Sequence, residues 1–239
     1  MIFDKKANNP LLAAGFMVKG LHWLNKPELR AFILIPVLIN FVLYSAALVL
    51  GYYYVNQLIA QFIPDWLHWL DWLLWPLFFI SFFVVGFFTF TLLANLIAAP
   101  FYGKLALKTQ ALLSGQTIAA IEPPLLHALG AELKRTAYFA RWALPLVLLS
   151  VIPGLNVLAP LLWGLFGAWG MALEYLAYPL ENEGILFAEQ KQLAQSIRWG
   201  AISFGGLAAL GSSLPVVNII IAPAAVIGAT MLVNELKRA

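Results

Sequence analysis

A short polar segment before the first long apolar run has the residue types that bind an oxyanion. It reads Asn25-Lys-Pro-Glu-Leu-Arg30, and uncharged residues follow from 31 to 64. If a helix begins here with proline in its first turn, its free backbone N–H groups and partial positive charge favour an anion. Leu29 would contribute its amide, and Arg30 would add its own amide and a guanidinium that can hold two oxygens at once. Lys26 is near enough to assist.

The same segment has a second interpretation. Lys26 and Arg30 could serve only as cytoplasmic anchors flanking a membrane helix, a common position for basic residues. Glu28 could cap the helix start through the spacing Asn25-x-x-Glu28. The residues alone leave both an anion site and a pair of anchors open.

The rest of the chain offers little chemistry. His22, His68 and His127 are widely separated and have no second ligand at metal-site spacing, so no metal site is expected. Cysteine is absent, which excludes thiolate catalysis. Neither a phosphate-binding Gly-Lys-Ser/Thr loop nor a nucleophile elbow occurs. We therefore expect neither an enzyme nor a cofactor, and the chain has no loop of its own for using ATP.

Composition indicates what kind of structure must position the polar segment. Hydrophobic residues make up 62% of the chain and charged residues only 10%, against about 25% charged in soluble domains. These values predict an integral membrane protein. The net charge of +3 is spread along the chain without a clustered basic face, so nucleic acid is not an expected partner.

Two charge-free runs in the second half contain turn signals in their interiors. Residues 142–173 include Pro153-Gly154, and residues 199–234 include Pro215. A spanning helix needs about 20 apolar residues, so each run is too long for one span and too short for two with a turn. We therefore predict two helical hairpins that enter the membrane, turn inside it and return.

The predicted fold is an all-α integral membrane protein with a single membrane domain over residues 1–239. It has two long transmembrane helices, two half-penetrating (re-entrant) helical hairpins and an N-terminal amphipathic interfacial helix. The predicted segments are the interfacial helix 10–25, spanning helices 29–63 and 72–99, hairpins 136–174 and 199–234, and cytoplasmic helical segments 100–135 and 175–198.

Basic residues predict the orientation of these segments. Residues 1–30 contain five Lys and Arg, residues 104–141 contain five more, and the link 65–71 contains none. The positive-inside rule therefore places both termini in the cytoplasm. The acids Glu181, Glu183 and Glu189 are expected to lie on a solvated cytoplasmic face.

Several motifs in their order along the chain resemble the CysZ family of bacterial sulfate permeases. The match covers nearly the whole chain, and its strength comes from the combined order and spacing of the motifs. They are Pro27-Glu-Leu-Arg30, Ile35-Pro-Val-Leu-Ile-Asn40, Ala99-Pro-Phe-Tyr-Gly103, Ile152-Pro-Gly-Leu-Asn156, Tyr175-Leu-Ala-Tyr-Pro179 and Pro215-Val-Val-Asn218 through Gly228-Ala-Thr230.

The resemblance implies sulfate uptake across the bacterial inner membrane by a multi-pass protein, for assimilation into cysteine. It also implies a sulfate-binding site at Glu28, Leu29 and Arg30. Many relatives have Gly-Leu-Arg there, whereas this chain has Glu28 in place of the glycine. A carboxylate at this position would repel a dianion unless it turns away or pairs with Lys26.

Two full spans cannot enclose a water-filled pathway, so transport would require a homo-oligomer in the lipid bilayer. The resemblance suggests a ring of subunits, with a hexamer as the expected form. Asn40, Asn95 and Arg141 are the predicted pathway-lining residues because polar groups at membrane depth usually face protein or water. Each could equally serve in helix packing or as an interface anchor. Two alternatives to a sulfate permease remain: a non-transporting membrane scaffold and a less selective anion channel.

Overall fold

The computed structural model describes residues 8–116, 119–121 and 123–237, apart from the side chains of residues 65, 68, 87, 88, 90–92, 94–96, 99, 215 and 216. Every regular element in these ranges is a helix. In chain order they are α1 (Pro10–Trp23), α2 (Pro27–Phe62), the short 3₁₀ helix η2 (Asp65–Leu70), α3 (Asp71–Ser114), α4 (Leu125–Val151), the 3₁₀ helix η3 (Leu155–Leu158), α5 (Ala159–Glu181), α6 (Phe187–Ser196), α7 (Arg198–Ser212) and α8 (Pro215–Lys237).

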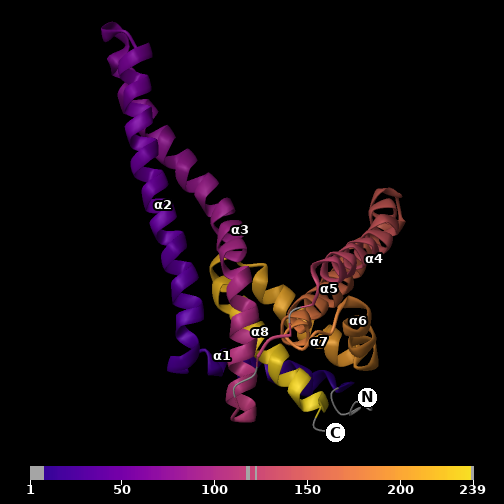
Figure 1. Cartoon of the computed structure of the whole chain (residues 1–239). Coiled ribbons are helices and arrows are strands. Elements are labelled where there is room, and N and C mark those ends of the chain that lie inside the picture. Colours follow the sequence, from indigo (N-terminus) through magenta and orange to yellow (C-terminus); the bar gives the residue numbers. More distant parts are fainter. Residues whose placement is uncertain (1–7, 117–118, 122, 238–239) are drawn as a thin grey trace.

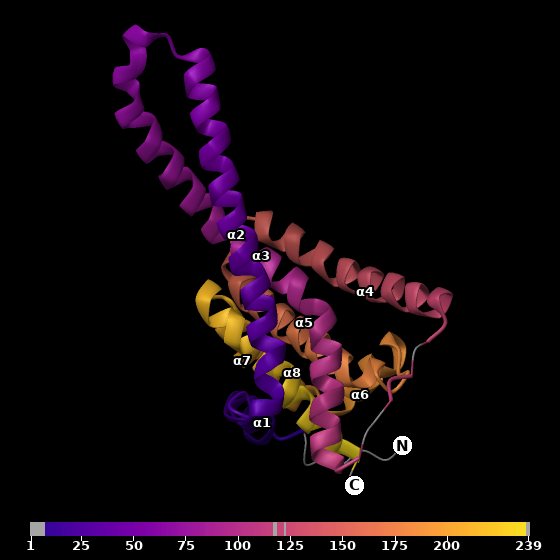
Figure 2. The same cartoon turned by 60° about the vertical axis from the view of Figure 1, so that its left-hand side comes forward.

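Two helical arms diverge from a common base (Figure 1). One arm is the antiparallel pair α2 and α3, and the other contains α4 and α5, while α1, α6, α7 and α8 form the base. Turning the molecule shows α4 reaching away from the base rather than packing into it (Figure 2). None of the described side chains of α4 is buried. The chain thus combines a compact base with two projecting arms.

Polar and aromatic contacts hold the α2–α3 arm together. The hydroxyls of Tyr44 and Thr89 lie 2.6 Å apart, and the rings of Tyr52 and Trp75 stack at 4.7 Å between centroids. A Cβ built on Gly51 would lie 3.2 Å from the ring of Phe78. Small residues and aromatic rings on the facing sides therefore let the two helices approach.

The first helix begins as its sequence predicts. The side chain of Asn9 accepts bonds from the amides of Leu11 and Leu12 at 2.9 and 3.5 Å, and Pro10 occupies the first helical position. Ala13, Phe16 and Met17 on this helix are buried. They pack in the hydrophobic core with α7 and α8, so α1 is a structural part of the base.

Close backbone contacts involving glycine connect the helices of the base. A Cβ built on Gly205 of α7 would lie 1.9 Å from the carbonyl oxygen of Ala168 on α5. One built on Gly20 of α1 would lie 2.1 Å from the carbonyl oxygen of Ala224 on α8. Such small residues allow helix backbones to meet, a common arrangement in membrane proteins.

The expected span 72–99 and the beginning of the expected helical segment 100–135 form one continuous helix, α3, which passes through Pro100 and ends at Ser114. Proline is tolerated inside membrane helices because neighbouring groups satisfy the freed backbone carbonyl. The helix stops instead at Gly115, whose φ of 72° is the left-handed conformation typical of a glycine after a helix.

Both predicted turns occur in helix–turn–helix units. The chain turns between α4 and α5 at residues 152–158, where Gly154 has a φ of 85°, and between α7 and α8 at residues 213 and 214. Among the described residues, three helices are long and apolar enough to cross a membrane: Pro27–Phe62, Leu155–Glu181 and Val217–Lys237. The architecture is that of a helical membrane protein, and helix length alone does not distinguish a spanning helix from a half-penetrating arm.

Candidate functional site

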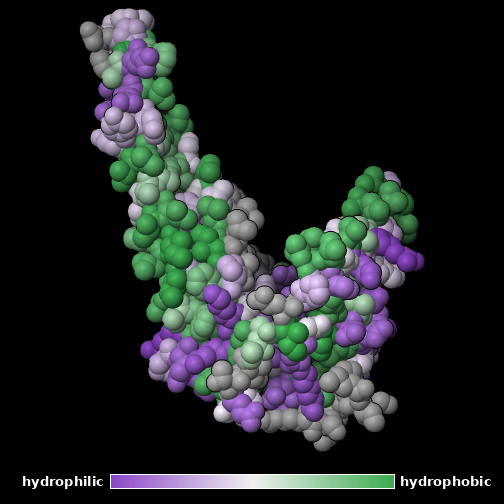
Figure 3. All heavy atoms as spheres, in the orientation of Figure 1, coloured by the Kyte–Doolittle hydropathy of each residue, from purple (hydrophilic) through white to green (hydrophobic). Residues whose placement is uncertain are grey.

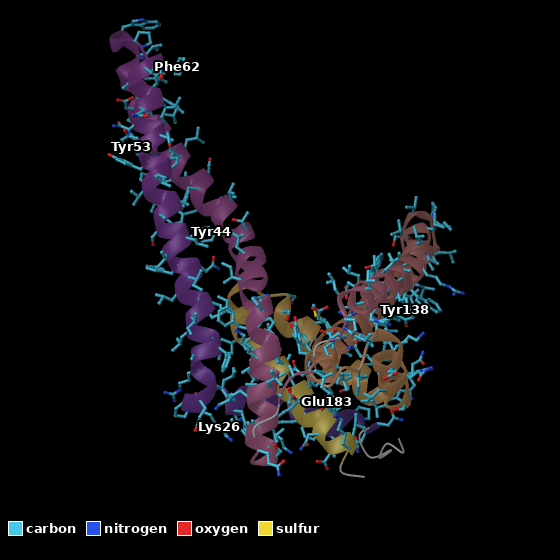
Figure 4. All side chains as sticks on the ribbon, in the orientation of Figure 1. Lys26, Tyr44, Tyr53, Phe62, Tyr138 and Glu183 are labelled. Atoms are coloured by element: carbon cyan, nitrogen blue, oxygen red, sulfur yellow. The ribbon has the colours of Figure 1, made fainter. Side chains whose placement is uncertain are left out.

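The predicted anion segment lies at the foot of the α2–α3 arm, where Lys26 is labelled in Figure 4. Pro27 is the first residue of α2 and has no N–H group. The amides of Leu29 and Arg30 both donate to the carbonyl oxygen of Lys26, at 3.0 and 3.3 Å. Both amides therefore already have a backbone acceptor. An anion that binds here would have to share these hydrogen bonds or replace them, above all the shorter one from Leu29 to Lys26.

The side chains of this segment point into different environments. Leu29 is fully buried, whereas Glu28 and Arg30 are exposed. The Lys26 ammonium lies 3.1 Å from the ring centroid of Trp23, a cation–π contact. No ion pair within the described ranges involves Glu28, Lys26 or Arg30. Arg30 therefore presents an exposed guanidinium with no ion-pair partner among the described residues, and Lys26 forms no ion pair with Glu28.

The expected cap by Asn25 and Glu28 is wrong. Lys26 is the N-cap residue of α2, and no side chain caps this helix. With Asn25 as the N-cap the helix would begin at Lys26 and Glu28 would be its third residue. The helix begins at Pro27, so Glu28 is its second residue. Its carboxylate still lies in the first turn, where it interacts favourably with the helix dipole.

Of the three predicted pathway residues, the structure describes the side chains of Asn40 and Arg141, which lie in different arms. Asn40 is fully buried on α2. Arg141 is exposed on α4, in the other arm. Asn95 lies on α3, where the structure does not describe its side chain.

An ionic cluster connects the start of the α4–α5 arm to α6. One Arg135 nitrogen lies 3.0 Å from a Glu181 carboxylate oxygen and 2.9 Å from the amide oxygen of Gln190, and another lies 3.2 Å from Glu132. The Arg135 side chain is only 16% exposed. Several hydrogen bonds to one half-buried guanidinium fix its position.

A second cluster joins the end of α8 to the turn after α5. Lys237 pairs with Glu183, which Figure 4 labels near the base, and Gln110 of α3 donates to Glu183 at 2.9 Å. The two acids expected on a solvated face thus also have ion-pair partners, and the Glu181 side chain stays 45% exposed while that of Glu183 is 27% exposed. Their partners come from 46 and 54 residues away, a distance that charge patterns in one segment cannot reveal.

A cavity of about 590 Å³ lies at the base of the two arms, where α3, α4 and α5 meet the end of α7 and the first half of α8. Phe139 and Phe166 line its apolar side. Its polar lining consists of Tyr102, Glu174, Tyr175, Tyr178, Ser212 and Asn218. The hydroxyl of Tyr178 donates to the Glu174 carboxylate at 3.4 Å. The sequence analysis did not select these residues for a site, although a lone acid in an otherwise apolar stretch was a usable signal.

Comparison with known proteins places the chain in a family. The model of the family described as sulfate transporter CysZ/etoposide-induced protein 2.4 matches residues 16–223. The chain belongs to this family. The match includes the foot of α2, the α4–α5 unit, α7 and the first part of α8, and it confirms the resemblance found in the sequence.

Curated relatives match over nearly the same length. A protein of Pseudomonas paraeruginosa named sulfate transporter CysZ is 38% identical over 228 residues, covering 90% of this chain and 92% of its own length. A protein of the same name from Pseudomonas fluorescens is 39% identical, with 90% of each chain covered. One from Pectobacterium atrosepticum is 36% identical, covering 91% of this chain and 82% of its own.

Proposed function

We propose that this protein imports sulfate across the bacterial inner membrane, to be assimilated into cysteine. The observation that carries the proposal is the end-to-end similarity to relatives named sulfate transporters, at 36 to 39% identity. The long apolar helices agree with a role inside a bilayer. An enzymatic function has no support in the motifs, and the chain acts as a transporter.

Sulfate binds at the foot of α2, at Glu28, Leu29 and Arg30. Two features support this position: the partial positive charge of a long helix's first turn, and the exposed guanidinium of Arg30, which can hold two sulfate oxygens. Glu28 is exposed and turns its carboxylate into solvent when sulfate is present. That rotation removes the repulsion that a fixed carboxylate would exert on a dianion.

The arms insert into the bilayer. The middle of the α2–α3 arm and the end of the α4–α5 arm carry a largely hydrophobic surface, while hydrophilic residues gather at the foot (Figure 3). On α2 this surface includes Leu34, Leu38 and Phe41, each more than half exposed. In our proposal α2 and α3 span the membrane, the α4–α5 and α7–α8 units enter it only part of the way, and α1 lies at the interface on the cytoplasmic side.

Several copies of the chain form the pathway. Asn40, Asn95 and Arg141 lie on different helices, and copies arranged around an axis, as in a hexamer, could bring such groups to one water-filled passage. The exposed apolar sides of the arms offer surface for both lipid and neighbouring copies.

Charge makes this transport demanding. Moving one elementary charge through a membrane potential of 100 mV changes its free energy by about 2.3 kcal/mol. Sulfate carries two negative charges, so its entry into a negatively charged interior costs about twice that. Uptake therefore needs a steep sulfate gradient or a second ion that moves with sulfate.

Flux of radiolabelled sulfate into proteoliposomes tests the proposal. We expect uptake by the intact chain and a loss of about tenfold or more in Arg30→Ala, because the guanidinium supplies charge-assisted bonds to the anion. Arg198→Ala is the matched control, since Arg198 is also exposed and also begins a helix.

The outcomes separate the alternatives. If assembled protein gives no uptake above empty liposomes, the sulfate proposal fails and a membrane scaffold becomes the leading explanation. Equal flux of chloride and sulfate would instead identify a general anion channel.

A further inference from the structure

Another cavity, of about 470 Å³, lies between the two helices of the α2–α3 arm, and we call it the arm groove. Its lining includes Leu43 and Ala47 of α2 and Val85 of α3, and none of its described lining residues carries a charge. The hydroxyls of Tyr44 and Thr89, which also line it, lie 2.6 Å apart and bond to each other. A polar ligand would lose its hydrogen bonds to water here and find few partners in return. The arm groove therefore suits an apolar ligand.

The arm groove extends along α3 and opens to the outside of the arm. Its lining on α3 runs from Phe78 to Leu93, about 22 Å of helix at 1.5 Å per residue. Leu43 and Val85 in the lining are 48% and 59% exposed, so a ligand can enter from the side. Half of a bilayer's hydrocarbon core is only about 15 Å thick. A whole acyl chain of one leaflet therefore fits along the groove, whereas one side chain of a neighbouring helix would fill only a part of it.

The position of the arm groove along the arm matches the outer leaflet. Phe78, at one end of the groove, lies beside Gly51, on which a Cβ would be 3.2 Å from the Phe78 ring. Gly51 follows Pro27 by 24 residues, which is about 36 Å along α2 from the foot. With the foot at one interface and a hydrocarbon core of about 30 Å, this end of the groove lies at the opposite interface. The stacked rings of Tyr52 and Trp75 are at the same end, as expected of an interfacial aromatic belt.

The charges near this end of the groove favour one kind of headgroup. Residues 31–103 contain no Lys or Arg, and their two acids are Asp65 and Asp71, between and at the start of the elements that join α2 to α3. Asp71 precedes Phe78 by seven residues, about 10 Å of helix. Its carboxylate repels an anionic headgroup and attracts an ammonium, and the faces of the aromatic rings at this end add to that attraction. An ethanolamine headgroup carries such an ammonium.

We propose that the arm groove binds one acyl chain of a phosphatidylethanolamine molecule, with the ammonium of its headgroup at the Tyr52–Trp75 stack near Asp71. The proposal rests on the proposed insertion of this arm in the bilayer and does not depend on sulfate transport. The bound chain fills space that the side chains of α2 and α3 leave open between them. It adds van der Waals contacts to both helices, so the lipid stabilises the arm.

Native mass spectrometry of the full-length protein in detergent tests the site, because one spectrum reports both bound lipid and the number of subunits. Palmitoyl-oleoyl phosphatidylethanolamine should bind saturably, and phosphatidylglycerol with the same chains should bind several-fold more weakly. Ala47→Trp places a large ring in the groove and should weaken phosphatidylethanolamine binding about tenfold or more. Ala46→Trp is the matched control, since Ala46 is also exposed on α2 but does not line the groove. Undiminished phosphatidylethanolamine binding by Ala47→Trp would overturn the site.

Asp71→Asn tests the choice of headgroup. It removes the carboxylate and should abolish most of the preference for phosphatidylethanolamine over phosphatidylglycerol. Equal binding of the two lipids by the intact chain would overturn the ethanolamine assignment. If Ala47→Trp instead changes the number of subunits and leaves the bound lipid unchanged, the groove is an interface between copies and the proposal fails. None of these experiments measures sulfate flux, so the lipid site and the transport proposal stand or fall separately.

Discussion

The helices α2 and α8 have similar apolar sequences but opposite surroundings. Only 11% of the residues in the most apolar stretch of α2 are buried inside the chain, against 72% for α8. Large side chains such as Leu38 and Val49 cover α2, whereas α8 carries small residues such as Ala224 and Gly228 at its contacts. Hydropathy thus indicates that a segment leaves water, and side-chain size indicates whether it faces lipid or protein.

The two helices should therefore respond differently to the same truncation. Leu232 on α8 is fully buried, and Leu232→Ala should lower the free energy of unfolding by about 2 to 5 kcal/mol because it opens a cavity. Leu38 on α2 is 61% exposed, and Leu38→Ala should change stability by less than about 0.5 kcal/mol. Unfolding of both variants in the same detergent gives the comparison. Equal losses would mean that α2 is as tightly packed as α8, for example by neighbouring copies.

Gly205 and Gly206 are neighbours on α7 but differ in how closely other atoms approach them. Gly205→Ala would put a methyl group 1.9 Å from the backbone oxygen of Ala168, so we expect a loss of about 1 to 3 kcal/mol in unfolding free energy. Gly206→Ala would place its Cβ 3.7 Å from the Ala168 side chain, an ordinary contact. That variant should be neutral, or stabilised by up to about 1 kcal/mol through helix propensity. Thermal unfolding of the pair measures the difference, and similar behaviour would show that α5 and α7 move apart easily.

The start of each of the first two helices could be predicted because it depends on neighbouring residues. Asn9 and Pro10 begin α1, and Pro27 begins α2, as local capping and proline rules require. The turns near Gly154 and Ser213 followed from the same local chemistry. Helix starts and turns are decided by a few adjacent residues, which a single sequence displays.

Contacts between distant segments could not be predicted in this way. The sequence around Glu183 does not indicate that Lys237 pairs with it, and the sequence around Glu174 does not indicate that Tyr102 lines the same cavity. The anion segment at the foot of α2 is a prediction from the local pattern, whereas the cavity could be recognised only from the fold.

A small effect is expected within the α2–α3 arm. Tyr44→Phe removes a hydroxyl that lies 2.6 Å from the Thr89 hydroxyl, yet Thr89 also donates to the carbonyl oxygen of Val85 and keeps that bond. Hydrogen bonds between membrane helices contribute about 0.6 kcal/mol on average, so the loss should be of that size. Hydrogen exchange at the amides of α2 and α3 measures it locally, with the exposed Tyr54→Phe as control. A loss above about 2 kcal/mol would mean that this one bond, rather than the fit of aromatic rings against Gly51 and its neighbours, holds the arm closed.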